Sequence, residues 1–234
     1  MSRRATDGLT TTSYAMLGML AIRPWTTYEL AKHMDRSLGR LWPRARSNLF
    51  NEPKRLVSHG LAQASQETVG RRPRTLYTIT PKGRRALRNW LGTPGGGPVL
   101  EFEELLKVFF ADHGTKDDAL AAVGHIRAWA EQQNAENIAV ARAYLAGTGP
   151  FPERAAVLAV VGRFMTDFAD MAGAWAQWAA SIIEEWPDEP RLAQPAWDAL
   201  EEVARRGRCS PDAQHLDRQP APGTAPAAAD HPGP

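Results

Sequence analysis

The sequence predicts a mainly α-helical protein in which a small basic unit with one β-hairpin precedes a longer, all-helical unit. Apolar residues recur at helical spacing over most of the chain, and strand-like runs occur only within residues 61–79. The stretch Thr93-Pro-Gly-Gly-Gly-Pro98 interrupts this pattern. Charge divides at the same place. Residues 1–93 carry seventeen Lys and Arg against five Asp and Glu, although the 234-residue chain has a formal net charge of only +2.

These features divide the chain into five segments. We expect an arm at residues 1–11, a compact unit at 12–92, a linker at 93–99, a helical unit at 100–208 and a disordered tail at 209–234. The tail is rich in Pro and Ala and has few large apolar side chains. A basic unit joined to an acidic one indicates that the first binds a polyanion and the second does not.

The first unit begins with three predicted helices. The first ends before Pro24, because proline cannot continue a helix. The second begins at Thr26 or Thr27, and Glu29 is spaced as the capping-box partner of Thr26. The third is expected over residues 46–59.

A hairpin and a fourth helix complete the first unit. Gly60 is expected to cap the third helix, and strands at 61–68 and 75–79 enclose a basic turn at 70–74. Thr80 then caps a helix that has Pro81 at its first position. The predicted order is thus three helices, a hairpin with a basic tip and a further helix. This is the element order of a winged helix-turn-helix with a two-stranded wing.

Cations gather on the third helix and the wing, the two elements that face a duplex in such a fold. Lys and Arg supply most of the affinity for DNA through counterion release, and helix side chains in the major groove read the bases. The candidate DNA-binding residues are Arg44, Arg46, Ser47, Asn48, Asn51, Lys54, Arg55, Arg71, Arg72 and Arg74. Pro53 predicts a kink or a helix that begins at Glu52. The alternative interpretation is a solvated basic face on an ordinary small domain.

The second unit has the pattern of a helical bundle. Helices are expected at 101–110, 116–146, 152–186 and 194–206. The short loop between the two long helices predicts an antiparallel hairpin. On the second long helix, a heptad stripe predicts a coiled-coil seam formed by Val157, Val161, Phe164, Phe168, Met171, Trp175, Trp178 and Ile182. In this hairpin we expect Gln133 and Asn137 to lie near Val161 and Phe164, and Trp175 and Trp178 to lie near Val123 and Ala119.

Two interpretations of this seam remain open. In the structural one, the aromatic residues form the core or a dimer seam, and the two amides set its register. In the other, they line a pocket for a small aromatic effector. The candidate effector-binding residues are Trp129, Gln133, Asn137, Phe164, Phe168, Trp175 and Trp178.

Other classes of protein are disfavoured. The sequence has no Gly-x-Ser-x-Gly, P-loop, dinucleotide fingerprint or His-x-x-x-His, so we expect no catalytic residues, no metal site and no cofactor. A single cysteine, Cys209, rules out an internal disulfide. The longest uncharged apolar stretch, residues 171–183, is shorter than the roughly 20 residues of a membrane span. We therefore expect a cytoplasmic protein that does not bind membranes.

Several short motifs resemble the PadR family of bacterial transcription regulators. In chain order they are Ser13-Tyr-Ala-Met-Leu-Gly-Met-Leu20, Tyr28-Glu-Leu30, Pro53-Lys-Arg-Leu56, Gly60-Leu61, Gly70-Arg-Arg-Pro-Arg-Thr-Leu-Tyr77 and Thr80-Pro-Lys-Gly83. The resemblance covers residues 12–92 closely and 100–208 only in helical character. It implies a homodimer with two winged-helix readers and a helical dimerisation domain. In many members a small aromatic compound releases the DNA.

The expected function is therefore a dimeric, sequence-specific DNA-binding repressor. Its partner is double-stranded DNA with an inverted-repeat operator, because a two-fold dimer reads two half-sites. One alternative is a winged-helix module that binds proteins and does not read DNA sequence. The other is a helical domain that binds a small molecule and carries a basic module.

Overall fold

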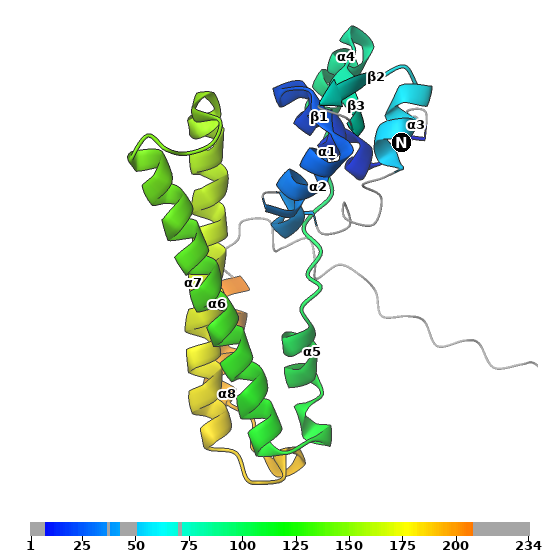
Figure 1. Cartoon of the computed structure of the whole chain (residues 1–234). Coiled ribbons are helices and arrows are strands. Elements are labelled where there is room, and N and C mark those ends of the chain that lie inside the picture. The colour runs from blue at the N-terminus through cyan, green and yellow to red at the C-terminus, as the bar shows by residue number, and fades with distance from the viewer. Residues whose placement is uncertain (1–7, 37, 43–50, 70–71, 208–234) are drawn as a thin grey trace, which may run out of the picture. The chain divides into compact units, whose positions relative to one another are not determined.

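The computed structural model describes residues 8–36, 38–42, 51–69 and 72–207. The chain forms two units, which divide between Pro98 and Val99 (Figure 1). The first holds four α-helices, one short 3-10 helix and a small antiparallel sheet among its described residues, and the second is helical. This confirms the predicted fold class. Among the described residues, no helix combines the length and apolarity that crossing a membrane requires.

The first unit follows the predicted order with two short additions, η1 and β1. Its helices are α1 (Thr11–Ile22), α2 (Thr27–Arg36), the short 3-10 helix η1 (Leu38–Arg40), α3 (Glu52–Ser58) and α4 (Pro81–Leu91), and its strands are β1 (Trp25–Thr26), β2 (Ala62–Val69) and β3 (Arg72–Ile79). The sheet order is β1-β3-β2, with both pairs antiparallel. β1 was not predicted, because two residues are too few to show an alternating pattern.

Local capping signals place the ends of these helices. At the start of α2, the Thr26 backbone N–H donates to Glu29 Oε2 over 2.9 Å, and Thr26 Oγ1 accepts from the Glu29 N–H over 3.2 Å. The capping box is thus on Thr26, and its backbone hydrogen bond lowers the pKa of the Glu29 carboxyl. Thr80 caps α4, with Pro81 at its first position as predicted. Gly60 ends α3 at a φ of +68°, where glycine is favoured.

The boundaries of α3 and the wing differ from the prediction. Within the described residues α3 begins at Glu52, as the position of Pro53 allowed, and residues 43–50 lie outside them. The second wing strand is longer than expected, because β3 already begins at Arg72. Pro73 is tolerated there because β1 pairs only with Leu76 and Tyr77, which leaves one side of β3 without a neighbouring strand at Pro73.

The core of the first unit surrounds α1. The side chains of Met16, Leu17, Leu20, Trp25, Leu30, Met34 and Leu56 are all fully buried. Trp25 also donates its indole N–H to the Met19 carbonyl over 2.7 Å, which holds β1 against α1. α4 covers another part of α1, where the rings of Tyr14 and Trp90 stack at 5.0 Å between centroids. This core fixes the positions of α3 and the wing.

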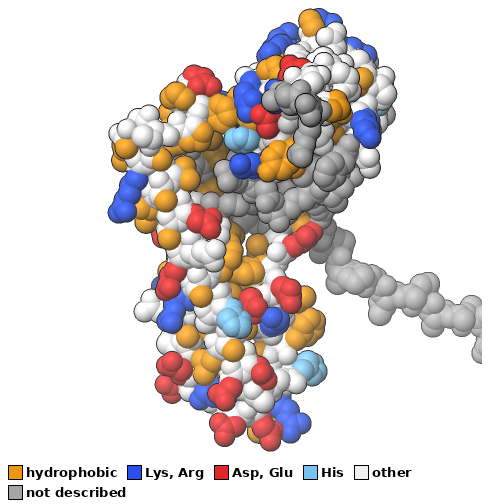
Figure 2. All heavy atoms as spheres, viewed as in Figure 1, with side chains coloured by type: hydrophobic (Ala, Val, Ile, Leu, Met, Phe, Trp, Pro, Cys, Tyr) orange, Lys and Arg blue, Asp and Glu red, His pale blue; other side chains and the backbone are white. Residues whose placement is uncertain are grey.

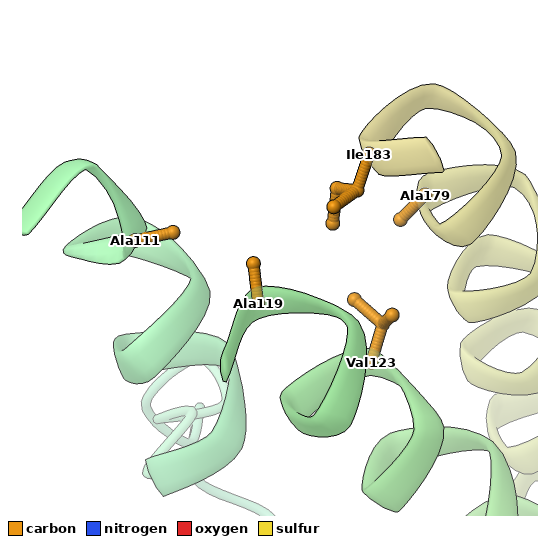
Figure 3. Packing of buried hydrophobic residues seen from close by; sticks show 5 residues of the cluster. All are labelled: Ala111, Ala119, Val123, Ala179 and Ile183. Carbon is orange, nitrogen blue, oxygen red and sulfur yellow. The ribbon is translucent and has the colours of Figure 1, made fainter. Parts of the chain in front are cut away.

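The second unit is built on two long antiparallel helices (Figure 1). Its elements are α5 (Glu103–Phe109), η3 (Ala111–His113), α6 (Lys116–Leu145), η4 (Pro152–Arg154), α7 (Ala155–Glu184), η5 (Pro190–Leu192) and α8 (Trp197–Gly207). The cap of α6 is Thr115, with Asp118 completing a capping box. Figure 3 shows Ala119 and Val123 of α6 near Ala179 and Ile183 of α7, with Ala111 beside them.

The face of α7 that packs on α6 was predicted wrongly. Its buried residues are Ala169, Ala172, Ala176, Ala179 and Ile183, which lie one position further along the chain than the predicted stripe. Alternate members of that stripe are exposed instead: Val157 by 56%, Phe164 by 63%, Met171 by 55% and Trp178 by 47%. Both stripes have the same four-three spacing, and the smaller alanines allow the helices to approach more closely.

Candidate nucleic-acid interface

α3 has one buried and one exposed face. Glu52, Pro53 and Leu56 are buried against the rest of the first unit, whereas Asn51 and Lys54 are exposed. Burial of Leu56 follows the prediction that this residue points inward. Asn51 and Lys54 therefore lie on the outward side, where an amide could read a base and an ammonium could contact a phosphate.

Arg55 is arranged differently from its neighbours. One nitrogen of its guanidinium donates to the Gly8 carbonyl, and Nη1 lies 3.7 Å from Glu52 Oε2. The side chain is thus directed towards the chain that precedes α1. Of the predicted contacts on α3, Asn51 and Lys54 are free to face a duplex, and Arg55 is held by contacts within the protein.

The wing carries an ion pair between its two strands. Arg74 lies opposite Glu67 in the β2–β3 ladder, and Arg74 Nη2 is 2.9 Å from Glu67 Oε2. Both side chains are partly exposed, so the pair contributes at most about 1 kcal/mol. A DNA phosphate could replace the Glu67 carboxylate at little cost. Arg72 belongs to β3 opposite Val69 rather than to a turn, which corrects the predicted turn at 70–74.

The other candidates of the first unit cannot be placed. Arg44, Arg46, Ser47, Asn48 and Arg71 lie outside the described residues. The described side chains add a cation that was not among the candidates. Lys82 of α4 donates from Nζ to the His59 carbonyl over 2.9 Å, which brings it to the C-terminal end of α3. The Thr80-Pro-Lys-Gly83 motif contains this lysine, but only the fold shows what it contacts.

Between α3 and the sheet, the surface is hollowed and nearly free of charge. The groove is lined by Val57, Gly60, Ala62, Gln63, Ala64, Ser65, Thr78 and Thr80. These small or neutral side chains allow another backbone to approach closely.

Figure 2 shows Lys and Arg side chains over the visible face of the first unit, and Asp and Glu side chains over much of the second. The charge asymmetry of the sequence is thus a property of the surface.

The candidate effector residues differ in their surroundings and exposure. Trp129 contacts the Phe168 ring edge-on at 6.0 Å, and Phe102 lies 5.3 Å from Trp129. Phe164 and Trp178 are exposed, so they do not wall an enclosed cavity. Trp175 packs as predicted against the cluster that contains Val123.

The register of α6 against α7 differs from the prediction. Asn134 donates to Asp170, and Ala130 faces Gly173, so Gln133 is level with residues 170–171 of α7, which is nearly two turns from its predicted neighbour Phe164. At about 1.5 Å per residue, the level of Gln133 is then roughly 12 Å along α7 from Trp178.

Two family models match the chain. The model of the PadR-like family of transcriptional regulators matches residues 16–89, and the virulence activator alpha C-terminal model matches residues 103–184. In sequence, the chain is 26% identical over 108 residues to the negative transcriptional regulator PadR of Bacillus subtilis. That match covers 45% of this chain and 59% of the length of the curated relative.

Solved structures share the fold. The crystal structure of Bacillus subtilis PadR in complex with operator DNA has a TM-score of 0.65 at 19% identity, over 74% of this chain and 99% of that chain. Its complex with p-coumaric acid has a TM-score of 0.59 at 19% identity, over 75% and 100%. The Vibrio cholerae virulence activator AphA has a TM-score of 0.52 at 21% identity, over 75% and 97%.

These matches cover both structured units, and the first contains the motifs that resemble PadR regulators. The expectation that the protein is not an enzyme is confirmed, because the matched family consists of regulators. The first unit of this chain therefore contains a domain of the PadR-like family of transcriptional regulators, and the helical region that follows it matches the virulence-activator type.

Proposed function

We propose that this protein is a homodimeric repressor that binds an inverted-repeat operator in double-stranded DNA. The observation that carries the proposal is the division of α3 into two faces. Leu56 and Pro53 anchor it in the core, while Asn51 and Lys54 face outward beside a wing that carries Arg74. An exposed amide next to exposed cations suits base reading combined with phosphate contact.

DNA binding is tested by selecting duplexes from a randomised pool with the full-length protein. If a dimer uses four phosphate-contacting cations per subunit, log K falls with log salt concentration at a slope of about −7. Lys54→Ala should weaken binding to every duplex and flatten this slope by about one unit per subunit. Asn51→Ala should instead relax the preference at particular bases, at a cost of roughly 1–3 kcal/mol. An affinity that is independent of salt would favour the alternative of a protein-binding module.

The dimer is supported by the exposed stripe on α7. Val157, Phe164, Met171 and Trp178 are each about half exposed or more, and they repeat every seven residues along one face. Large exposed apolar stripes mark interfaces, and a second copy of the helix offers the same repeat. Repression is tested with a reporter gene whose promoter carries the selected duplex, and expression should rise when the regulator is removed.

A small aromatic effector is supported by the Bacillus subtilis relative that was crystallised with p-coumaric acid. In this chain the contacting rings of Phe102, Trp129 and Phe168 offer aromatic surface where α5, α6 and α7 meet. Quenching of tryptophan fluorescence by p-coumaric acid, compared between the wild type and Trp129→Phe, tests binding there. A compound that quenches but leaves DNA affinity unchanged would contradict a role as effector.

A further inference from the structure

The first residue of α3 is a buried carboxylate. Glu52 is only 4% exposed, although the helix that it begins has seven residues and lies at the surface on its other side. Burial of a carboxylate is costly unless partners replace its water. A solvent-exposed Glu52 side chain would avoid this desolvation cost. Its burial therefore indicates that its hydrogen-bond and ionic partners contribute to the placement of α3.

Both carboxylate oxygens of Glu52 have a partner. Ser13 Oγ, itself fully buried, donates to Oε1, and Arg55 lies 3.7 Å from Oε2. Ser13 is in turn fixed by the capping box of α1. It accepts from the Thr10 N–H over 2.9 Å, and its own N–H donates to Thr10 Oγ1 over 3.2 Å. Glu52 is therefore bonded to a group whose own position is set.

Thr12, which precedes Ser13 in α1, contacts the chain just before residues 43–50. Trp42 Nε1 donates to Thr12 Oγ1 over 3.0 Å. Trp42 and Glu52, which flank these residues, are thus bonded to consecutive side chains in the first turn of α1. A seven-residue helix has little stability of its own, so its orientation depends on such attachments.

The apolar contacts of α3 do not set its rotation as closely. Pro53 and Leu56 are buried, but hydrophobic burial is non-directional and tolerates small rotations of a short helix. Hydrogen bonds and an ion pair at a buried carboxylate are directional. The same carboxylate contacts Arg55, whose other nitrogen is held by the Gly8 carbonyl.

We propose that Glu52 is a specificity-determining positioning residue. Together with Ser13 it sets the rotation of α3 on α1 so that Asn51 and Lys54 meet the bases and phosphates, and it holds Arg55 away from non-specific phosphate contact. The inference rests on the proposed DNA-binding function. It predicts that loss of this contact reduces the discrimination between duplexes more than it reduces affinity for DNA in general.

The test compares two dissociation constants for full-length Glu52→Gln. One is for the duplex that the wild type selects from a randomised pool, and the other is for a shuffled duplex of the same length and composition. Gln keeps the shape and can accept from Ser13, but it cannot form the ion pair with Arg55. We expect the ratio of the two constants to fall at least about 10-fold, while the shuffled duplex binds equally well or more tightly. A purely structural role would lower the unfolding temperature and leave this ratio unchanged.

Two further variants keep the test decisive. Glu67→Gln on the wing removes the same charge at a partly exposed site. It should shift both dissociation constants by a similar factor and leave their ratio unchanged. If the ratio falls as much as in Glu52→Gln, the proposal is overturned. Ser13→Ala retains the Glu52 charge and removes its donor, and the ratio should fall again. If Glu52→Gln does not fold, Ser13→Ala decides, and an unchanged ratio there overturns the proposal. A wild type that selects no duplex would refute the proposed function itself.

Discussion

A methyl group added at Gly83 is expected to destabilise the winged-helix unit, although alanine is normally the better helix former. Gly83 lies in the first turn of α4, in helical backbone geometry. A Cβ atom built there would lie 2.1 Å from the Leu61 carbonyl oxygen and 2.9 Å from Ile79 Cγ1. An ordinary carbon–oxygen contact is about 3.3 Å. The clash is with backbone, which cannot move aside as the end of a long side chain could.

The surroundings of Leu61 make relief expensive. Its N–H donates to the Leu56 carbonyl over 2.8 Å, and its carbonyl accepts from the Thr80 N–H over 3.0 Å. To remove an overlap of about 1 Å, α4 must shift and strain the cap at Thr80. Overpacking costs about 1–3 kcal/mol and a weakened cap costs about 1 kcal/mol, whereas the higher helix propensity of alanine contributes about 1 kcal/mol. The free energy of unfolding should therefore fall by roughly 1–3 kcal/mol.

Gly18 provides the matched control in the same unit. It is in the middle of α1, and a Cβ built there meets no atom within 4 Å apart from the nearby backbone of its own helix. Gly18→Ala should therefore stabilise the unit by up to about 1 kcal/mol. The two variants make the same chemical change and should have effects of opposite sign.

Amide hydrogen exchange of the full-length protein, followed by mass spectrometry, measures the stability of this unit separately. In peptides from α1 and β3, the slowest amides of Gly83→Ala should exchange roughly 5- to 150-fold faster than in the wild type. Those of Gly18→Ala should exchange more slowly, and peptides from α6 and α7 should be unchanged in both. Exchange in Gly83→Ala that is as slow as in the wild type would refute the steric argument.

Two other predictions concern the second unit and the cap of α2. Phe164→Glu should raise the dissociation constant of the dimer more than about 100-fold in analytical ultracentrifugation without loss of helical circular dichroism, because burial of a carboxylate costs several kcal/mol. An unchanged sedimentation coefficient would place the dimer interface elsewhere. The lowered pKa of Glu29 means that its hydrogen bonds from Thr26 stabilise the fold fully above the ordinary value of 4.5, and that this contribution is lost as the pH falls through the folded-state pKa. Glu29→Gln should weaken the dependence of the unfolding temperature on pH between about 5 and 3, and an identical dependence in both proteins would contradict it.

Features that depend on nearby residues could be predicted from the sequence. The capping box between Thr26 and Glu29, the start of α4 at Thr80-Pro81 and the end of α3 at Gly60 each involve residues within four positions of one another. Local hydrogen bonds and backbone preferences determine them almost regardless of the rest of the chain. The charge difference between the units is likewise a matter of composition.

Only the tertiary structure decided which residues meet across long separations. Arg74 pairs with Glu67 because β3 begins inside the predicted turn, and Glu52 is buried because α1 offers Ser13 there. Neither partner could be identified from the spacing along the chain. The same applies to β1, whose two residues form a strand only because β3 lies beside them.

The packing of α7 on α6 shows most clearly why the sequence alone does not predict which face of a helix is buried. A four-three repeat starting at one residue of α7 is equally regular when it starts at the next, so periodicity alone cannot choose between the large apolar stripe and the alanine stripe. Hydrophobicity favours the stripe with Phe164 and Trp178, whereas packing favours the small side chains that let α6 and α7 approach. Within one chain the close approach decides the outcome, and the larger side chains remain exposed. Sequence pattern determined that α7 is a long amphipathic helix, and steric fit against α6 determined which of its faces is covered.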